Sequence, residues 1–266
     1  MQKRIFRIAT LSKPFSFFTL ISLRIKKPGC NRELLKSPLP ILLSMKGNKT
    51  LRDPEVYGVL AALDEEFIDK SIRYAIIGGL GVQIHLAGML GKEGKYPVNK
   101  CPGLEDLLRR TGDVDVIVRP TEEISMCTFF NYFSALYPHF KVFNGTDHAL
   151  VAGLVINYLD SPQKLKGFGY LFSTILDKSE SVLVSFGNKT TAFSVQAKEY
   201  LIAAKLSGDR LKPKDSIDVQ ALLKAAHEVG RPLNYEIITR VLQEVNKSER
   251  IPILEGWKKD YSEHRL

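Results

Sequence analysis

The sequence predicts an α/β fold that continues into a C-terminal helical region. Short apolar runs typical of strands alternate with helical patterns over residues 46–193, and only helical patterns follow. Within the first part, "YAIIGGLGVQIH" passes from strand to helix at two glycines. We therefore expect a basic leader over residues 1–45, an α/β domain over residues 46–193 and a helical domain over residues 194–266.

The first expected helix follows Asp53 and Pro54, a plausible cap and first position. Its apolar residues recur at helical spacing, as Val56, Leu60, Leu63, Phe67 and Ile68. "RYAII" predicts a short strand, and "GLGVQIHLAGML" predicts a helix that starts at the glycines. The stretch from Gly91 to Gly103 holds Gly, Pro and Lys and little that could pack, so we expect a surface loop there.

Beyond this loop, "LEDLLRR" predicts a short helix and "DVDVIV" a strand. "TEEISMCTFFNYFSAL" predicts a helix that opens at Thr121, and strands are expected at "HFKVF", "ALVAGLVINYL" and "SVLVSF". The helical region then contains "QAKEYLIAAKLSG", "KDSIDVQALLKAAHEVG" and "NYEIITRVLQEVNKS".

The net charge of +9 is concentrated at the N-terminus. Residues 1–44 hold nine Lys or Arg residues and one acid, whereas the remainder holds 29 basic and 28 acidic residues. The body is therefore nearly neutral, and its charge gives no reason to expect a polyanion as partner. The leader has three interpretations: a disordered or wrongly assigned segment before Met45, a signal peptide around Phe15–Leu23, or a transit peptide.

The apolar run Phe15–Leu23 is about nine residues long, far short of the roughly 20 that span a bilayer, so we expect no membrane segment. The three cysteines, Cys30, Cys101 and Cys127, lack metal or disulfide spacing. A reducing cytosol, and hence a cytoplasmic protein, is the expectation.

Two stretches suggest chemistry. A glycine pair between strand and helix lets a phosphate approach the N–H groups of the helix N-terminus, although glycine also serves any tight turn. Asp113 and Asp115 lie two apart on an expected strand, so both carboxylates emerge on one face. Such a pair binds Mg²⁺ or Mn²⁺, or it lies in solvent at the end of a strand.

Taken in order, "IIGGLGVQIH", "RRTGDVDVIV" and "EYLIAAKLSGDRLKPKDSIDVQALLK" resemble motifs of the polymerase-β-like nucleotidyltransferase superfamily. Within it, the chain looks most like the minimal nucleotidyltransferase and AbiEii-type toxin group. The resemblance implies a mixed sheet, so that residues 46–193 would be the nucleotidyltransferase domain. It also implies a helical region that helps to close the nucleotide cleft, and transfer of a nucleoside monophosphate from an NTP with release of pyrophosphate.

The resemblance also implies roles for particular residues. Gly78 and Gly79 would hold the triphosphate, and Asp113 and Asp115 would hold Mg²⁺ or Mn²⁺. The remaining matches to the family motifs are Arg110 and Thr111 before the DxD strand, the phosphate-proximal Lys205, and the acids Asp215 and Asp218 of the last motif.

Two departures from the family pattern concern the site. The segment between His85 and Arg109 is longer than expected, and Asn157 stands where many relatives carry a third carboxylate. The amide oxygen of Asn157 can still coordinate Mg²⁺, so Asn157 is the third expected metal ligand. Asp160 lies three residues further on, on the opposite face if the strand continues, and Asp147 is a second substitute at the mouth of a hairpin.

Three functions follow as hypotheses. The first is a metal-dependent nucleotidyltransferase of a toxin-like kind that uses an NTP and modifies RNA (tRNA) or a protein hydroxyl. The second is a degenerate nucleotide-binding module in which Asn157 has removed catalysis. The third is a partner-binding protein, one half of a toxin–antitoxin pair, whose Lys-rich loop from Lys92 to Lys100 forms the contact surface.

Overall fold

A computed structural model describes residues 49–121, 123–165 and 168–263. The predictions for the basic leader lie outside these residues. The strands, in chain order, are β1 (Arg73–Ile77), β2 (Asp113–Arg119), β3 (Val142–Asn144), β4 (His148–Val151), β5 (Leu154–Leu159), β6 (Glu180–Phe186) and β7 (Lys189–Val195). They form one sheet in the order β3-β4-β5-β2-β1-β7-β6.

The sheet is mixed. β1 runs antiparallel to β2 and parallel to β7, and β2 runs parallel to β5, whereas the outer pairs are antiparallel. The expected α/β fold with a mixed sheet is confirmed.

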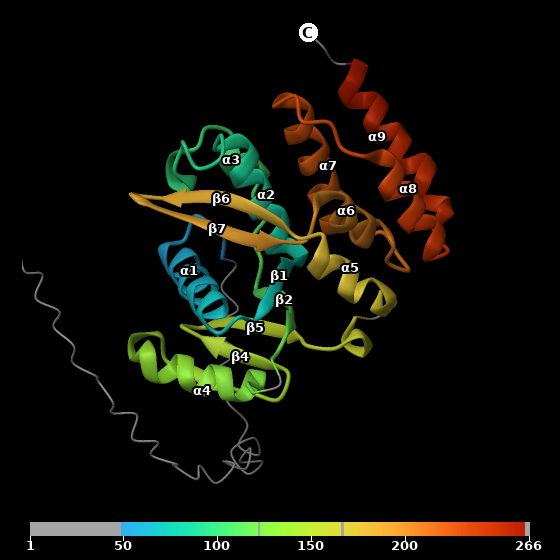
Figure 1. Ribbon diagram of the computed structural model, residues 1–266. Coiled ribbons are helices and arrows are strands. Elements are labelled where there is room, and N and C mark those ends of the chain that lie inside the picture. Colours follow the sequence, from blue (N-terminus) through green and yellow to red (C-terminus); the bar gives the residue numbers. More distant parts are fainter. Residues whose placement is uncertain (1–48, 122, 166–167, 264–266) are drawn as a thin grey trace, which may run out of the picture. The chain divides into compact units, whose positions relative to one another are not determined.

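The helices are α1 (Pro54–Asp69), α2 (Gly78–Leu90), α3 (Leu104–Leu107), α4 (Met126–Leu136), α5 (Phe172–Asp177), α6 (Lys198–Leu206), α7 (Pro213–Glu228), α8 (Tyr235–Glu244) and α9 (Ile251–Glu263). Figure 1 shows α4 beside β4 and β5, and α6 to α9 gathered beyond α2. The predicted domain boundary at residue 193 falls near the end of β7. Within the described residues, no helix is both long and apolar enough to cross a membrane.

Helix α2 is the element that joins the sheet to the helical region. Every residue from Leu80 to Met89 is buried, because α2 packs on the sheet and also against α6 and α7. A helix that is apolar on all sides is stable only when it is covered on all sides. The polar Gln83 is buried because both ends of its amide are bonded: Oε1 accepts from Leu51 N at 2.7 Å and Nε2 donates to Arg109 O at 2.8 Å.

Aromatic side chains connect α1, α4 and the sheet. Phe67 of α1 stacks on Phe129 of α4 with ring centroids 4.7 Å apart, and it also contacts Tyr74 of β1 at 4.9 Å. All three side chains are buried. Such pairs add to the free energy of burial, so this cluster anchors the helices that flank the sheet.

Three sequence predictions differ from the structure. Helix α4 begins at Met126 rather than at Thr121, because Ser125 caps it by accepting from Thr128 N at 3.2 Å. The run "ALVAGLVINYL" is a hairpin, since Ala152 and Gly153 both have positive φ and form its two-residue turn.

The third difference lies in the expected surface loop from Gly91 to Gly103. Val98 and Cys101 are each only 1% exposed, so part of this loop belongs to the core. Two helices, α5 and α9, also form where the sequence pattern predicted none.

Candidate active site

The turn from β1 into α2 brings the backbone of Gly78 against Asp115. Gly78 has a φ of +67°, and a Cβ at this position would lie 2.7 Å from Asp115 Oδ2. Any other residue would therefore meet both backbone strain and a clash. The N–H groups of the first turn of α2, and the positive end of the helix dipole, therefore lie beside a carboxylate.

Asp113 and Asp115 lie on the same face of β2, as their spacing predicts. Asp115 pairs with Ile77 of β1 on one side and with Asn157 of β5 on the other, so it stands at the centre of the sheet. Burial raises the pKa of the Asp115 carboxyl, the hydrogen bond from Asn157 lowers it, and the negative charge of Asp113 raises it. A cation bound here would offset the free-energy cost of keeping the Asp115 carboxylate charged in this partly buried position.

Asn157 faces Asp115 directly. Its Nδ2 donates to Asp115 Oδ1 at 2.9 Å across the parallel pair of β2 and β5. The structure thus brings Asn157 together with the DxD strand, at the position where the resemblance expects a third acid. Asn157 supplies a donor to Asp115 in this arrangement and adds no negative charge.

The two possible substitutes for a third acid are engaged elsewhere. Asp160 lies just beyond β5 and pairs with Lys164, Oδ1 to Nζ 2.9 Å. The exposed Asp147 bonds the ring of His148 at 2.9 Å, and this hydrogen bond lowers the pKa of its carboxyl. In this structure it is Asn157, not Asp147 or Asp160, that bonds to Asp115.

A network of four charged groups joins the helical region to the site. Asp218 of α7 is 3% exposed and accepts two hydrogen bonds from Arg109, from Nε and from Nη2, each 3.0 Å long. Lys205 of α6 lies 2.8 Å from Asp218 Oδ2 and 3.2 Å from Asp215 Oδ1. Two cations and two carboxylates thus neutralise each other, and the bidentate Arg–carboxylate pair fixes the guanidinium.

Arg109 is the site residue that the sequence interpretation missed. A Cβ on Gly79 would lie 2.6 Å from Arg109 Nη2, so the guanidinium lies over the first turn of α2. The signal was present: Arg109, Thr111, Asp113 and Asp115 alternate along an extended chain and share one face. The resemblance pointed instead to Arg110.

Because the chain is extended here, the neighbouring side chains of Arg110 and Thr111 point to opposite faces. Thr111 Oγ1 donates to Asp113 Oδ1 at 3.3 Å and would be 3.4 Å from a Cβ on Gly79, so it joins the site. The Arg110 side chain is exposed and lines a different, polar cavity of about 540 Å³ with Arg52, Asp53 and neighbouring residues. The structure does not bring Arg110 to the carboxylates.

The donor set can be tested against Mg²⁺ or Mn²⁺. In the described part of the chain, no three His, Cys, Asp or Glu side chains converge in a way that would hold a metal ion. Asp113 and Asp115 share one face of β2, and Asp115 is a half-buried anion whose charge is partly offset by the Asn157 amide and by the positive charges of Lys205 and Lys214. Mg²⁺ is commonly held by one or two carboxylates together with substrate phosphates, so the residues fit that mode of binding.

Comparisons with known proteins find similar solved structures. No family model matches this chain, and no curated protein matches it. A solved structure of an antigenic nucleotidyltransferase-like protein from Paracoccidioides brasiliensis is similar, with a TM-score of 0.47 and 16% identity over 77% of this chain and 92% of that chain. The similarity is too low to carry an argument about function, which rests on the geometry of the site.

Proposed function

We propose that this chain is a metal-dependent nucleotidyltransferase that moves a nucleoside monophosphate from an NTP to a hydroxyl group of an RNA or a protein, as toxin-like enzymes of this superfamily do. The supporting observation is the contact of Gly78 with Asp115, where a Cβ would be 2.7 Å from the carboxylate. It joins, at one point, a helix N-terminus suited to phosphate and a carboxylate pair suited to Mg²⁺.

The residues of the chain have separate tasks in this proposal. The first turn of α2 receives the triphosphate, and Arg109, held by Asp218, offers a fixed guanidinium beside Gly79. Asp113 and Asp115 would hold Mg²⁺, which would neutralise charge on the phosphates. Lys205 keeps Asp215 and Asp218 in place and contributes positive charge that lowers the pKa of Asp115.

The reaction balances without a protein nucleophile. The acceptor oxygen forms a bond to the α-phosphorus as the bond between that phosphorus and the bridging oxygen breaks. Pyrophosphate leaves, and the hydroxyl proton passes to solvent. The protein contributes position and charge, which are the main sources of catalysis in phosphoryl transfer.

A transfer assay tests the proposal. The full chain is incubated with each α-labelled NTP, with Mg²⁺ or Mn²⁺, and with total RNA or no RNA. We expect label in RNA or on the protein, and we expect its loss in Asp113→Asn. Absence of label with all four NTPs and both metals would refute catalysis.

The second candidate is a nucleotide-binding module without catalysis, and the hydrogen bond from Asn157 to Asp115 favours it. That bond places a neutral donor where a carboxylate would add charge for metal binding. In this case the chain would bind an NTP and show no transfer. Calorimetric titration with NTP alongside the labelling assay separates the two candidates.

A further inference from the structure

A cavity lies in the helical region, apart from the candidate active site. It has a volume of about 430 Å³ and opens between the second half of α7, the segment from Gly230 to Leu233, the start of α8, and α9. This size is within the range of pockets that hold small ligands. On α7 the lining begins at Leu223, beyond Asp218, and it includes none of the site residues Arg109, Thr111, Asp113, Asp115 and Asp218, so the cavity is distinct from the candidate active site.

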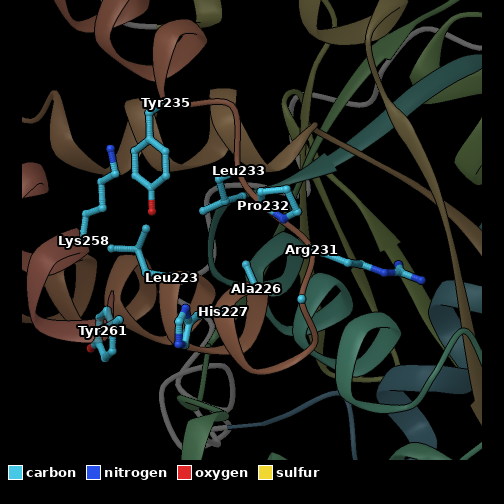
Figure 2. A pocket seen from close by; sticks show the side chains of 10 residues that line it. Leu223, Ala226, His227, Arg231, Pro232, Leu233, Tyr235, Lys258 and Tyr261 are labelled. Carbon is cyan, nitrogen blue, oxygen red and sulfur yellow. The ribbon is translucent and has the colours of Figure 1, made fainter. Parts of the chain in front are cut away.

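The lining combines an apolar wall with rings. Leu223, Ala226 and Leu233 are buried and form the apolar part, and the rings of Tyr235, Tyr261 and His227 border it. Figure 2 shows Tyr235 and Tyr261 coming from α8 and α9 on either side of Leu223. Aromatic rings beside an apolar wall suit a flat aromatic guest, and ring nitrogens and phenol hydroxyls can bond its polar edge.

One cation is directed to this cavity. Lys258 Nζ lies 4.4 Å from the centroid of the Tyr235 ring. Lys258 Nζ also lies 3.7 Å from the carboxylate of Glu255, which is one turn earlier on α9 and has half of its side chain exposed. No Asp or Glu is among the described lining residues. Arg231 also lines the cavity, but its guanidinium points away from the other labelled side chains in Figure 2 and pairs with Glu93.

We propose that this cavity is a second nucleotide site, which takes a nucleobase against the apolar wall and rings and a phosphate against Lys258. A purely aliphatic guest would contact only the apolar part of the lining, whereas a nucleotide also contacts Lys258 and the Tyr235 hydroxyl. Base–aromatic stacking with a cation for the phosphate is the usual means of holding an unpaired nucleotide. The nucleotide could be free in solution or the unpaired end of an RNA strand, since both present the same base and phosphate.

The test is equilibrium dialysis of the full chain against labelled AMP and, separately, against a short labelled oligoadenylate. Both are run in EDTA, so that binding dependent on a divalent metal does not contribute. We expect saturable binding of at least one ligand. Tighter binding of the oligoadenylate identifies an RNA end as the source, and equal or tighter binding of AMP identifies the free nucleotide.

Variants locate the binding. Lys258→Gln and Tyr235→Leu are each expected to weaken binding by about tenfold, from the loss of a charged contact and of stacking respectively. Lys224→Gln is the matched control: it lies on α7, is half exposed and pairs with Glu228, but it does not line this cavity. It should leave the Kd unchanged, as should Asp113→Asn in the candidate active site.

Several results would overturn the proposal. These are no saturable binding of either ligand, an unchanged Kd in Lys258→Gln, equal losses in Lys258→Gln and Lys224→Gln, or loss of binding in Asp113→Asn. Lys258 is 45% exposed, so its substitution should not unfold the chain even if Tyr235→Leu does. Because Asp113→Asn disables only the carboxylate site, failure of this proposal and failure of the nucleotidyltransferase proposal give different patterns.

Discussion

Asn157 donates its side-chain amide to Asp115, Nδ2 to Oδ1 at 2.9 Å, across two neighbouring parallel strands. The bond satisfies a half-buried carboxylate whose pKa is raised by its burial. The register of β2 and β5 places residue 157 against Asp115, which is where a third acid would lie. The charge at this position, rather than its location, differs from the third acid that the resemblance in the sequence leads us to expect.

Asn157→Asp should destabilise the metal-free protein and strengthen its binding of divalent metal. It replaces a hydrogen bond with two carboxylates about 3 Å apart, so like-charge repulsion should cost roughly 1–3 kcal/mol. Urea unfolding in EDTA and in Mg²⁺ measures both effects. Equal stability of variant and wild type in EDTA would show that residue 157 does not face a charged Asp115.

Asp115→Asn should abolish nucleotide transfer without loss of stability. Because burial raises the pKa of Asp115, folding carries a cost for its charged form relative to the unfolded chain, and a neutral amide removes that cost. We expect unfolding free energies within about 1 kcal/mol of the wild type. Asp177→Asn, at an exposed pair with Arg73, serves as control and should keep full activity. Retained transfer in Asp115→Asn would remove the carboxylate pair from the mechanism.

Gly79→Ala should weaken NTP binding, and Gly58→Ala should not. A Cβ on Gly79 meets Arg109 Nη2 at 2.6 Å and displaces the guanidinium from the first turn of α2, whereas a Cβ on Gly58 in α1 has nothing within 4 Å. Gly58→Ala should instead add up to about 1 kcal/mol of stability through helix propensity. Calorimetric titration with NTP compares the two variants. Equal affinities would mean that the glycine pair serves only the turn.

Asp218→Asn should be far more destabilising than Asp215→Asn. Asp218 is 3% exposed and binds both Arg109 and Lys205, so its loss leaves two cations without their shared carboxylate. Breaking a buried pair in this way costs about 3–5 kcal/mol, whereas the partly exposed Asp215 has one contact of 3.2 Å and should cost about 1 kcal/mol. Urea unfolding measures the loss of stability in each variant, and similar losses for the two variants would contradict the ion-pair network.

Stability should fall as the pH drops from roughly 7 to 5, and His85 should account for much of the change. Burial lowers the pKa of His85 from 6.5 to about 4, while its bond to Gln196 O and the charge of Glu180 raise it and Lys198 lowers it. The unfolded chain therefore takes up a proton that the folded chain refuses, which costs at most about 2 kcal/mol over this range. His85→Gln should flatten the pH dependence of urea unfolding, and an unchanged slope would exclude His85 as its source.

Local patterns determined the elements that depend on neighbours in the chain. The strand "RYAII", the helix that starts at Gly78 and the DxD strand were all predicted, because alternation and a glycine turn are properties of adjacent residues. Errors arose where side chains set a boundary. The Ser125 cap moved the start of α4, and the Ala152–Gly153 turn divided an apolar run that showed no break.

The residues of the candidate site divide in the same way. Gly78, Gly79, Asp113 and Asp115 could be named from spacing, and Thr111 from the resemblance. The role of Arg109 depends on Asp218, which is 109 positions away, and that of Asn157 on the register of β5 beside β2. A one-residue shift in that register would turn Asn157 to the other face.

The sequence by itself therefore determined the α/β class, the helix that follows the glycine pair and the shared face of the two aspartates. Tertiary structure decided that Asp218 holds Arg109, that Lys205 is paired with two carboxylates, and that α7, α8 and α9 enclose a cavity. The physical reason is that backbone preference and periodicity act between near neighbours. Ion pairs and cavities depend on which distant elements pack together and at what register, and no local pattern encodes this.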